Sequence, residues 1–341
     1  MDGMKKNIKK TKIDLLRDSA GSFNLNTPDD ESEISEMFSF DDRLLIIKGE
    51  GVYEIKLADQ IDPERQNAST PNTIQKIIPF GTNHPWVGRI LLTAHRLFKT
   101  DFLQDHINCD EMMRHIINII EDISALYELV HKYNEEEKST IENHDLRIKK
   151  DRTFILPTIR NVEVRCNEYL QKYDHSLSEL FTIVKKCYPD VNKGGWDSLQ
   201  KKIESQPKDI DNFFDFLTGA LPLLHMIRNA RNCVEHPKDH QRLIVNNFSL
   251  DSKNNLLPPI MKVIHPKTAI EDIPVLRFFT ENFQNLIEVI ELMLVFLCAR
   301  NMKIVSRFPV KIIHLPEDVQ KSKNVRYGYG INIGGQDVPM S

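Results

Sequence analysis

The chain has 341 residues, of which 40% are hydrophobic and 28% charged, and its formal net charge is -4. This balance is typical of a globular protein rather than of a disordered or membrane one. The length predicts two domains or one elaborated domain. No protein-wide positive field gathers nucleic acid on such a chain, so a nucleic-acid ligand would require a local basic site.

The cysteines are odd in number and scattered singly, without any Cys-x-x-Cys spacing: Cys109, Cys166, Cys187, Cys233 and Cys298. This pattern predicts neither a disulfide framework nor a structural zinc. His106, Cys109 and His115 match no ligand spacing, and the chain has neither nucleotide-binding glycine motif. We therefore predict no metal and no cofactor.

Residues 1–12 carry five lysines without an apolar stretch behind them, so we expect no signal peptide. The most apolar segment, 287–299, contains Glu288 and Glu291 and is too short to span a bilayer. The sequence therefore predicts a cytoplasmic protein with no membrane partner.

In chain order, residues 1–40 form a polar lead-in, and 41–108 form a small β-hairpin and helix region. Two apolar runs within 43–57 flank Gly49-Glu50-Gly51 and predict a hairpin. Residues 60–83 lack periodicity and predict a loop. Residues 85–102 predict the first helix.

Residues 109–302 predict a helical domain. Apolar residues recur at three- and four-residue steps over 111–136, which indicates a long amphipathic helix. A second helical tract, 140–187 with Pro157 as its kink, predicts an antiparallel helical hairpin with the first. Two further helices are expected, and they cover 196–204 and 273–302.

Between these helices, Gly219 and Pro222 interrupt the segment 211–236, and Pro222 fits the first turn of a new helix. That helix ends near His236, because Pro237 disfavours the helical conformation of the residue before it. Residues 238–271 form a strand-like insertion and 303–341 an extended tail. The predicted fold class is mainly α: a helical bundle with a long helical hairpin and short peripheral β elements.

The helix ending at His236 carries the residues with chemical potential. One face holds its apolar stripe, and the opposite face carries polar side chains three or four residues apart. Arg231 lies beside this polar face. The polar residues are His225, Arg228, Asn232, Glu235 and His236.

These residue types suit RNA cleavage without a metal. The negative end of the helix dipole favours the protonated form of His236, and an arginine offers a planar fork of donors to a phosphate. RNA brings its own nucleophile, the 2'-hydroxyl. The transition state then needs positive charge at the phosphate and proton transfer at the two oxygens.

The string Arg231-Asn232-Cys233-Val234-Glu235-His236 resembles the Arg-Asn-x-x-x-His motif of HEPN domains. The resemblance implies a HEPN-like helical fold over 109–302 and a metal-independent endoribonuclease that acts as a homodimer, with two motif helices facing each other across a cleft. It implies that Arg231 stabilises the phosphate, that His236 supplies acid/base chemistry and that Asn232 orients the histidine. Arg228 and His225 are the expected substrate-binding residues. A toxin or antiviral defence role, with an unidentified regulatory partner, is the setting it suggests.

Two other interpretations stay open. Arg231 and Glu235 are four residues apart and can form an ordinary surface ion pair, so the chain can be a non-catalytic dimerisation or adaptor module. A nucleotide- or small-ligand-sensing domain would instead have a closed pocket near His225 and Arg228. An enzyme requires Arg231 and His236 in one shared cleft, whereas a scaffold has them in structural pairs or scattered in solvent.

Overall fold

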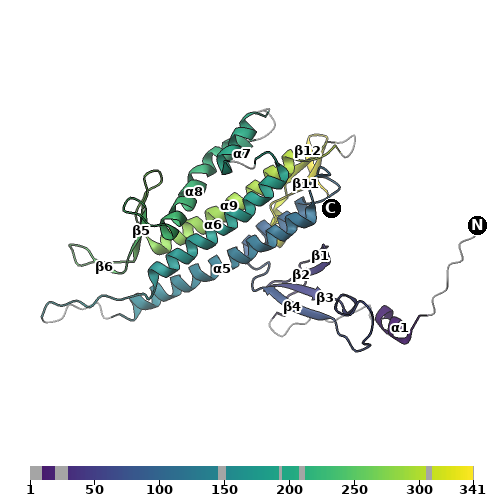
Figure 1. Cartoon of the computed structure of the whole chain (residues 1–341), viewed down its shortest axis with the longest axis horizontal. Coiled ribbons are helices and arrows are strands. Elements are labelled where there is room, and N and C mark those ends of the chain that lie inside the picture. The colour runs from purple at the N-terminus through teal and green to yellow at the C-terminus, as the bar shows by residue number, and fades with distance from the viewer. Residues whose placement is uncertain are drawn as a thin grey trace, which may run out of the picture. The chain divides into compact units, whose positions relative to one another are not determined.

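The computed structural model describes residues 10–19, 30–144, 151–191, 194–206, 212–304 and 309–340. The chain divides into two compact units, 1–88 and 89–341. Figure 1 shows the long helices of the second unit as its dominant feature. A π-helical segment, Gly88–Leu92, lies at the division in the sequence.

The first unit is built on an antiparallel sheet with the strand order β1-β2-β3-β4. Its strands are β1 (Glu36–Phe40), β2 (Arg43–Ile47), β3 (Val52–Lys56) and β4 (Thr73–Ile78). Helix α1 (Lys12–Ser19) and the short helices α2 (Ala58–Ile61) and α3 (Pro85–Val87) accompany the sheet. The turn from β2 to β3 packs against Gly81, where an added Cβ would lie 2.0 Å from the carbonyl oxygen of Lys48. Only glycine therefore fits there.

The second unit is organised around long helices that pack side by side. They are α5 (Cys109–Glu142), α6 (Val162–Cys187), α8 (Phe213–Glu235) and α9 (Val275–Arg300), with the shorter α4 (Thr93–Leu97), α7 (Gly195–Glu204) and α10 (Glu317–Lys323). The amide of Glu111 donates to the side chain of Asn108 over 3.1 Å, which caps the first turn of α5. Helix α6 packs against α5, α8 and α9, so it lies at the centre of the group.

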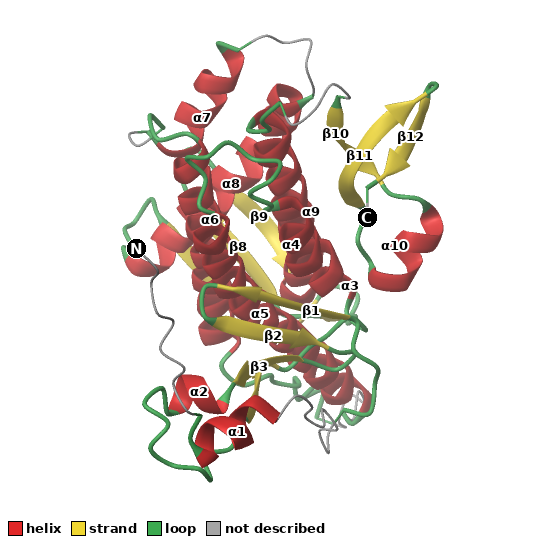
Figure 2. Cartoon of the chain, turned by 90° about the vertical axis from the view of Figure 1, so that its right-hand side faces the viewer, coloured by secondary structure: helices red, strands yellow, loops and turns green. Residues whose placement is uncertain are grey.

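Three sheets belong to the described part of this unit (Figure 2). Strands β5 (Arg242–Asn246), β8 (Ile260–Ile264) and β9 (Ile270–Pro274) form one, and β6 (Ser249–Leu250) pairs with β7 (Leu256–Leu257) in another. Near the C-terminus, β10 (Val310–His314), β11 (Tyr327–Ile333) and β12 (Gln336–Pro339) form the third. Strands β5 and β8 both contact α8, so this sheet supports the helix that carries the motif.

Helix α9 supplies much of the core, and Phe278, Phe279, Leu286, Ile290 and Leu294 are all buried. By length and composition α9 is apolar enough to cross a membrane, and it is the one described helix for which this holds. Most of its apolar window is buried within the chain, as in the core helix of many folded domains. The five cysteines are free and buried.

The expected mainly α helical bundle is wrong, because the chain is mixed α/β. About half of it is helical and about a fifth is in strands, which form four separate sheets in the described residues. The expectation failed because the sequence of a short apolar run does not indicate which distant strand will pair with it. Strand β5 pairs with β8 and β10 pairs with β11, each across an intervening segment of chain.

Several local predictions are confirmed and others are corrected. The hairpin over 43–57 is confirmed by the pairing of β2 with β3. The loop expected over 60–83 is wrong where β4 forms and pairs with β3. The helix break expected at Pro222 is also wrong, since α8 continues through it. Buried Leu217, Leu221 and Leu224 hold α8 by packing, which outweighs the one backbone hydrogen bond that proline removes.

Candidate active site

The polar face of helix α8 borders a cavity of about 510 Å³, and helix α6 also lines this cavity. Arg228, Arg231 and Glu235 line it from α8, at the three- and four-residue spacing that puts side chains on one face. From α6 the lining residues include Glu168, Lys172, Asp174 and His175. Three cationic side chains therefore face three carboxylates and one histidine.

Asp174 lies at the centre of this cluster and is only 8% exposed. Its Oδ2 accepts a hydrogen bond from Nη1 of Arg228 over 2.9 Å and lies 3.5 Å from Nε of Arg231. Burial raises the pKa of the Asp174 carboxyl, although Arg228 and Arg231 oppose that shift. Arg231 also pairs through Nη1 with Glu235, one helical turn later. Both arginines are thus held by carboxylates, but Arg228 remains 56% exposed at the cavity.

The structure leaves His236 outside the residues that line this cavity. Helix α8 ends at Glu235, and His236 adopts φ -133° and ψ 60°, so the main chain leaves the helical path at this residue. Its amide donates to the carbonyl oxygen of Asn232 over 2.9 Å. Gln241 then donates from Nε2 to the carbonyl oxygens of Asn232 (3.2 Å) and His236 (3.3 Å). Asn232 and Gln241 therefore fix the main chain at His236.

His225 lies in a neighbouring cavity of about 460 Å³. Its Nε2 is 3.2 Å from Oδ1 of Asp197, on α7. Phe181 and Trp196 also line this cavity, and their rings meet edge to face with centroids 4.8 Å apart. The two cavities share Asp174, Ser178 and Arg228, so Arg228 stands between His225 and Arg231.

A further histidine, His175, which the sequence did not single out, lines the same cavity as Arg228 and Arg231. Nδ1 of His175 pairs with Oδ2 of Asp122 on α5, and Nζ of Lys172 lies 3.2 Å from Oδ1 of the same carboxylate. Asp122 is only 4% exposed, whereas His175 is 59% exposed. The contact comes from residues 53 positions apart, so no local pattern marks it. The only sequence signal was Asp122 on the otherwise apolar face of α5.

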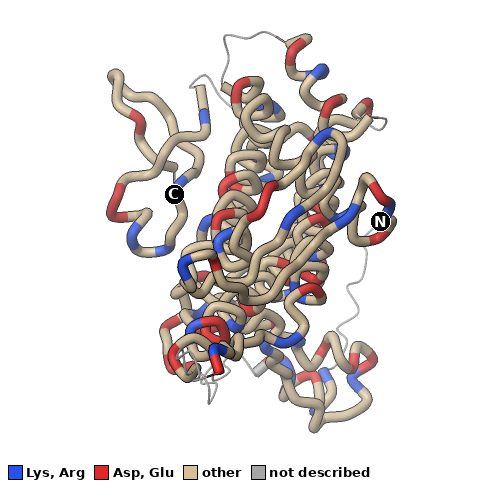
Figure 3. The backbone as a smooth tube through the Cα atoms, turned by 90° about the vertical axis from the view of Figure 1, so that its left-hand side faces the viewer, with Lys and Arg blue, Asp and Glu red and all other residues tan. Residues whose placement is uncertain are grey.

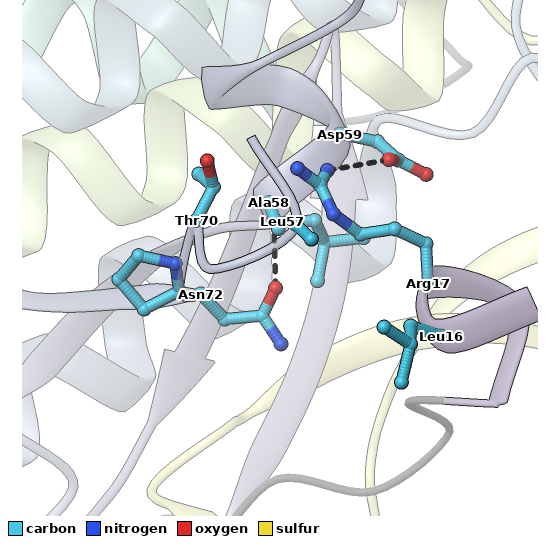
Figure 4. Close-up of a pocket in the computed structure, with 9 residues that line it drawn as sticks. Leu16, Arg17, Leu57, Ala58, Asp59, Thr70 and Asn72 are labelled. Carbon is cyan, nitrogen blue, oxygen red and sulfur yellow. Dashed lines mark hydrogen bonds and ion pairs between the residues drawn. The ribbon is translucent and has the colours of Figure 1, made fainter. Parts of the chain in front are cut away.

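The first unit has a cavity of its own, of about 380 Å³, shown in Figure 4. Arg17 borders it, but its guanidinium is held by Asp59 (2.7 Å), Asp62 (2.9 Å) and the carbonyl oxygen of Asn67 (3.0 Å). The Asn72 side chain accepts from the amide of Ala58 over 2.7 Å. These polar groups join α1, α2 and the loop before β4, so their role is structural.

Charged residues of both signs are interspersed over the described chain (Figure 3), in keeping with the net charge of -4. Any anion site on such a chain would therefore be local. No family model, no curated protein and no solved structure matches the chain. The case for function consequently stands on the motif and on the geometry around it.

Proposed function

We propose that this protein is a metal-independent endoribonuclease of the HEPN motif type, and that the cavity between α6 and α8 holds the scissile phosphate. The observation that carries the proposal is that Arg228 and Arg231 line one cavity together with Glu235, the residue directly before His236. Two guanidinium groups on one surface match the charge and geometry of a phosphodiester. The motif and this cavity support the proposal, and similarity of the overall fold to a HEPN domain does not enter it.

Donors remain for a phosphate despite the ion pairs with Asp174 and Glu235. Each guanidinium has five N–H donors. The pairs within the described residues engage Nη1 of Arg228 and both Nε and Nη1 of Arg231. Nη2 of Arg231, and Nε and Nη2 of Arg228, are left to bind an anion. A phosphate can therefore add to the cluster without displacing Asp174.

The motif assigns proton transfer to His236 and a supporting role to Asn232. The carbonyl oxygen of Asn232 accepts from the His236 amide, which fixes the main chain at the histidine. His236 is exposed and follows a cavity-lining residue. In the proposed homodimer, a second copy facing α8 would enclose the histidine and the arginines in one cleft.

The neighbouring cavity suits a base of single-stranded RNA. Trp196 and Phe181 offer ring surfaces there, and Arg228 connects the two cavities. Stacking of bases on aromatic side chains next to a cationic phosphate site is a recurrent way to hold single strands. His225 is then a substrate-binding residue at the base rather than at the phosphate.

Two observations favour the alternative of a non-catalytic adaptor or dimerisation module. Arg231 is engaged by Asp174 and Glu235, as expected of a structural arginine, and His236 is exposed outside the cavity that Arg231 lines. In that case the ion pairs fix α8 against α6, and the exposed side of α8 binds another protein. The two functions differ in whether Arg231 is needed for activity or only for stability.

The test is cleavage of single-stranded RNA by the purified protein in excess EDTA. We expect cleavage that leaves 2',3'-cyclic phosphate ends and that is lost in His236→Ala. His240→Ala is the matched control, because His240 is also exposed and lies four residues further along the chain. A folded dimer of the wild-type chain that leaves RNA intact would favour the adaptor.

A further inference from the structure

The proposed reaction needs two proton-transfer groups, and the motif of each chain contributes one histidine. The 2'-oxygen attacks phosphorus while the bond from phosphorus to the 5'-oxygen breaks. In an in-line displacement these two oxygens lie on opposite sides of the phosphorus. A base on one side takes the 2'-hydroxyl proton, and an acid on the other gives a proton to the 5'-oxygen. A single imidazole does not reach both.

His175 has the position and the partner of the second group. It lines the same cavity as Arg228 and Arg231, but comes from α6. The buried carboxylate of Asp122 holds its Nδ1, so Nε2 is the nitrogen turned to the exposed side. A buried carboxylate on one imidazole nitrogen fixes the ring orientation and stabilises the imidazolium, which is the arrangement of a catalytic histidine–aspartate pair.

We infer that His175, held by Asp122, is the general acid that protonates the 5'-oxygen of the leaving nucleotide in the cavity of Arg228 and Arg231. The inference rests on the proposed ribonuclease function and deepens it. His236 then acts as the base. His175 loses the Nε2 proton to the 5'-oxygen and His236 gains one from the 2'-hydroxyl. The products are a 2',3'-cyclic phosphate and a 5'-hydroxyl, and exchange with solvent restores both histidines.

A purely structural role explains His175 less well. Asp122 already has a cationic partner in Lys172, so its burial does not require a second one. A comparison lies on the same two helices, where Nδ1 of His115 is 2.7 Å from Oε2 of Glu179. His115 is only 21% exposed and lines neither of the two cavities next to Arg228. Of these two histidine–carboxylate pairs, only the one at His175 faces the arginines.

The experiment compares two substrates whose leaving groups differ in their need for a proton. One is a short single-stranded RNA, and the other is uridine 3'-(4-nitrophenyl phosphate), whose nitrophenolate leaves without protonation. We expect His175→Ala to reduce RNA cleavage about 10²–10⁴-fold and to reduce cleavage of the nitrophenyl ester far less. His236→Ala should reduce both, and the matched control His115→Ala neither.

Asp122 is a positioning residue in this scheme. Asp122→Asn should show the same dependence on the leaving group as His175→Ala, at smaller magnitude, which a merely structural role would not produce. Thermal unfolding of each variant verifies that it is folded, and His175→Gln serves if His175→Ala is not.

The outcomes separate the two proposals. If the wild-type chain cleaves RNA and His175→Ala cleaves it at the same rate, this inference is overturned and the proposed function stands. Equal loss on both substrates also overturns it, because the acid role predicts a difference. A wild-type chain that cleaves neither substrate overturns the proposed function and this inference together.

Discussion

Two arginine–carboxylate clusters in the second unit have the same chemistry but differ in their surroundings. In the first, Glu291 on α9 is fully buried and accepts from Nε of Arg89 over 2.6 Å and from Nε of Arg326 over 2.8 Å. In the second, Asp174 holds Arg228 and Arg231 at the edge of a cavity. The first cluster joins three segments of the chain. Arg89 lies in the π-helical segment before α4, Glu291 lies in α9, and Arg326 directly precedes β11.

The difference indicates how to tell a structural arginine from a functional one. Arg326 gives its Nε and Nη2 to Glu291, and its Nη2 also lies 3.0 Å from Glu288, so its donors are directed inward. Its hydrogen bond to Glu291 raises the Arg326 pKa further above its usual range. Arg228 donates to Asp174 through Nη1, and its remaining N–H groups belong to a side chain that lines the cavity. Arg228 is 56% exposed and Arg326 is 29% exposed, so exposure of unused donors, rather than the presence of an ion pair, separates these two arginines.

The largest effect on stability is expected for Glu291→Ala. Removing the carboxylate leaves Arg89 and Arg326, both partly buried, with only the half-exposed Glu288 as a common partner. We expect this to cost about 3–5 kcal/mol in the free energy of unfolding. Urea unfolding followed by circular dichroism measures this loss. Glu288→Ala is the control, because Glu288 is 47% exposed and its removal should cost much less. Equal losses for the two variants would contradict the description of Glu291 as the centre of the cluster.

Arg231→Ala should have the opposite profile. We expect RNA cleavage to fall about 10²–10³-fold, equivalent to about 2.7–4 kcal/mol of transition-state stabilisation, with a small change in unfolding. The measurement pairs a cleavage assay with the unfolding curve of the same sample. Arg160→Ala is the matched control, since Arg160 is also followed by asparagine but is exposed and lies away from the cavity. A stability loss without an activity loss would assign Arg231 to the structural class.

A third carboxylate, Glu137 on α5, pairs with no cation among the residues that the structure describes. It is 8% exposed, and neither its Oε2 nor the Tyr133 hydroxyl finds a hydrogen-bond partner in the described residues. Burial raises the Glu137 pKa. Protonated Glu137 therefore contributes to the free energy of unfolding at low pH, and this contribution is lost as pH rises through the folded-state pKa of Glu137.

Glu137→Gln should accordingly stabilise the protein by about 1 kcal/mol at pH 7, with little effect near pH 4, because glutamine does not titrate. Thermal unfolding at the two pH values measures the difference. Glu135→Gln, at an exposed position on the same helix, should change neither value. A destabilised Glu137→Gln would show that the charge is needed.

Asp174→Asn should give the smallest stability effect, because Arg228 and Arg231 partly offset the burial of the charge. The Asp174 pKa is raised, so the free energy of unfolding that this carboxyl contributes is present at low pH and lost as pH rises through its folded-state pKa. The variant should therefore gain stability over the wild type with rising pH. Unfolding between pH 3.5 and 7 tests the sign, and a gap that narrows with rising pH would contradict it.

The sequence predicted local features well where a single element carries the signal. Apolar residues at helical spacing located α5, whose residues Ile116, Ile120 and Ile123 are buried. Pro237 marked the end of α8 at Glu235. The polar face with Arg228, Arg231 and Glu235 was also visible, and these three residues do line one cavity. Each of these features depends on neighbours within one or two turns.

The residues that complete the candidate site came from tertiary structure alone. Arg228 meets Asp174 across 54 positions, and His175 meets Asp122 across 53. The strand pairings that make the chain mixed α/β are of the same kind. Periodicity records which face of an element is buried, but it carries no information on the element that covers that face. The sequence by itself therefore determined the helices and the motif face, and only packing of α5, α6 and α8 decided which carboxylates and which histidine stand beside the arginines.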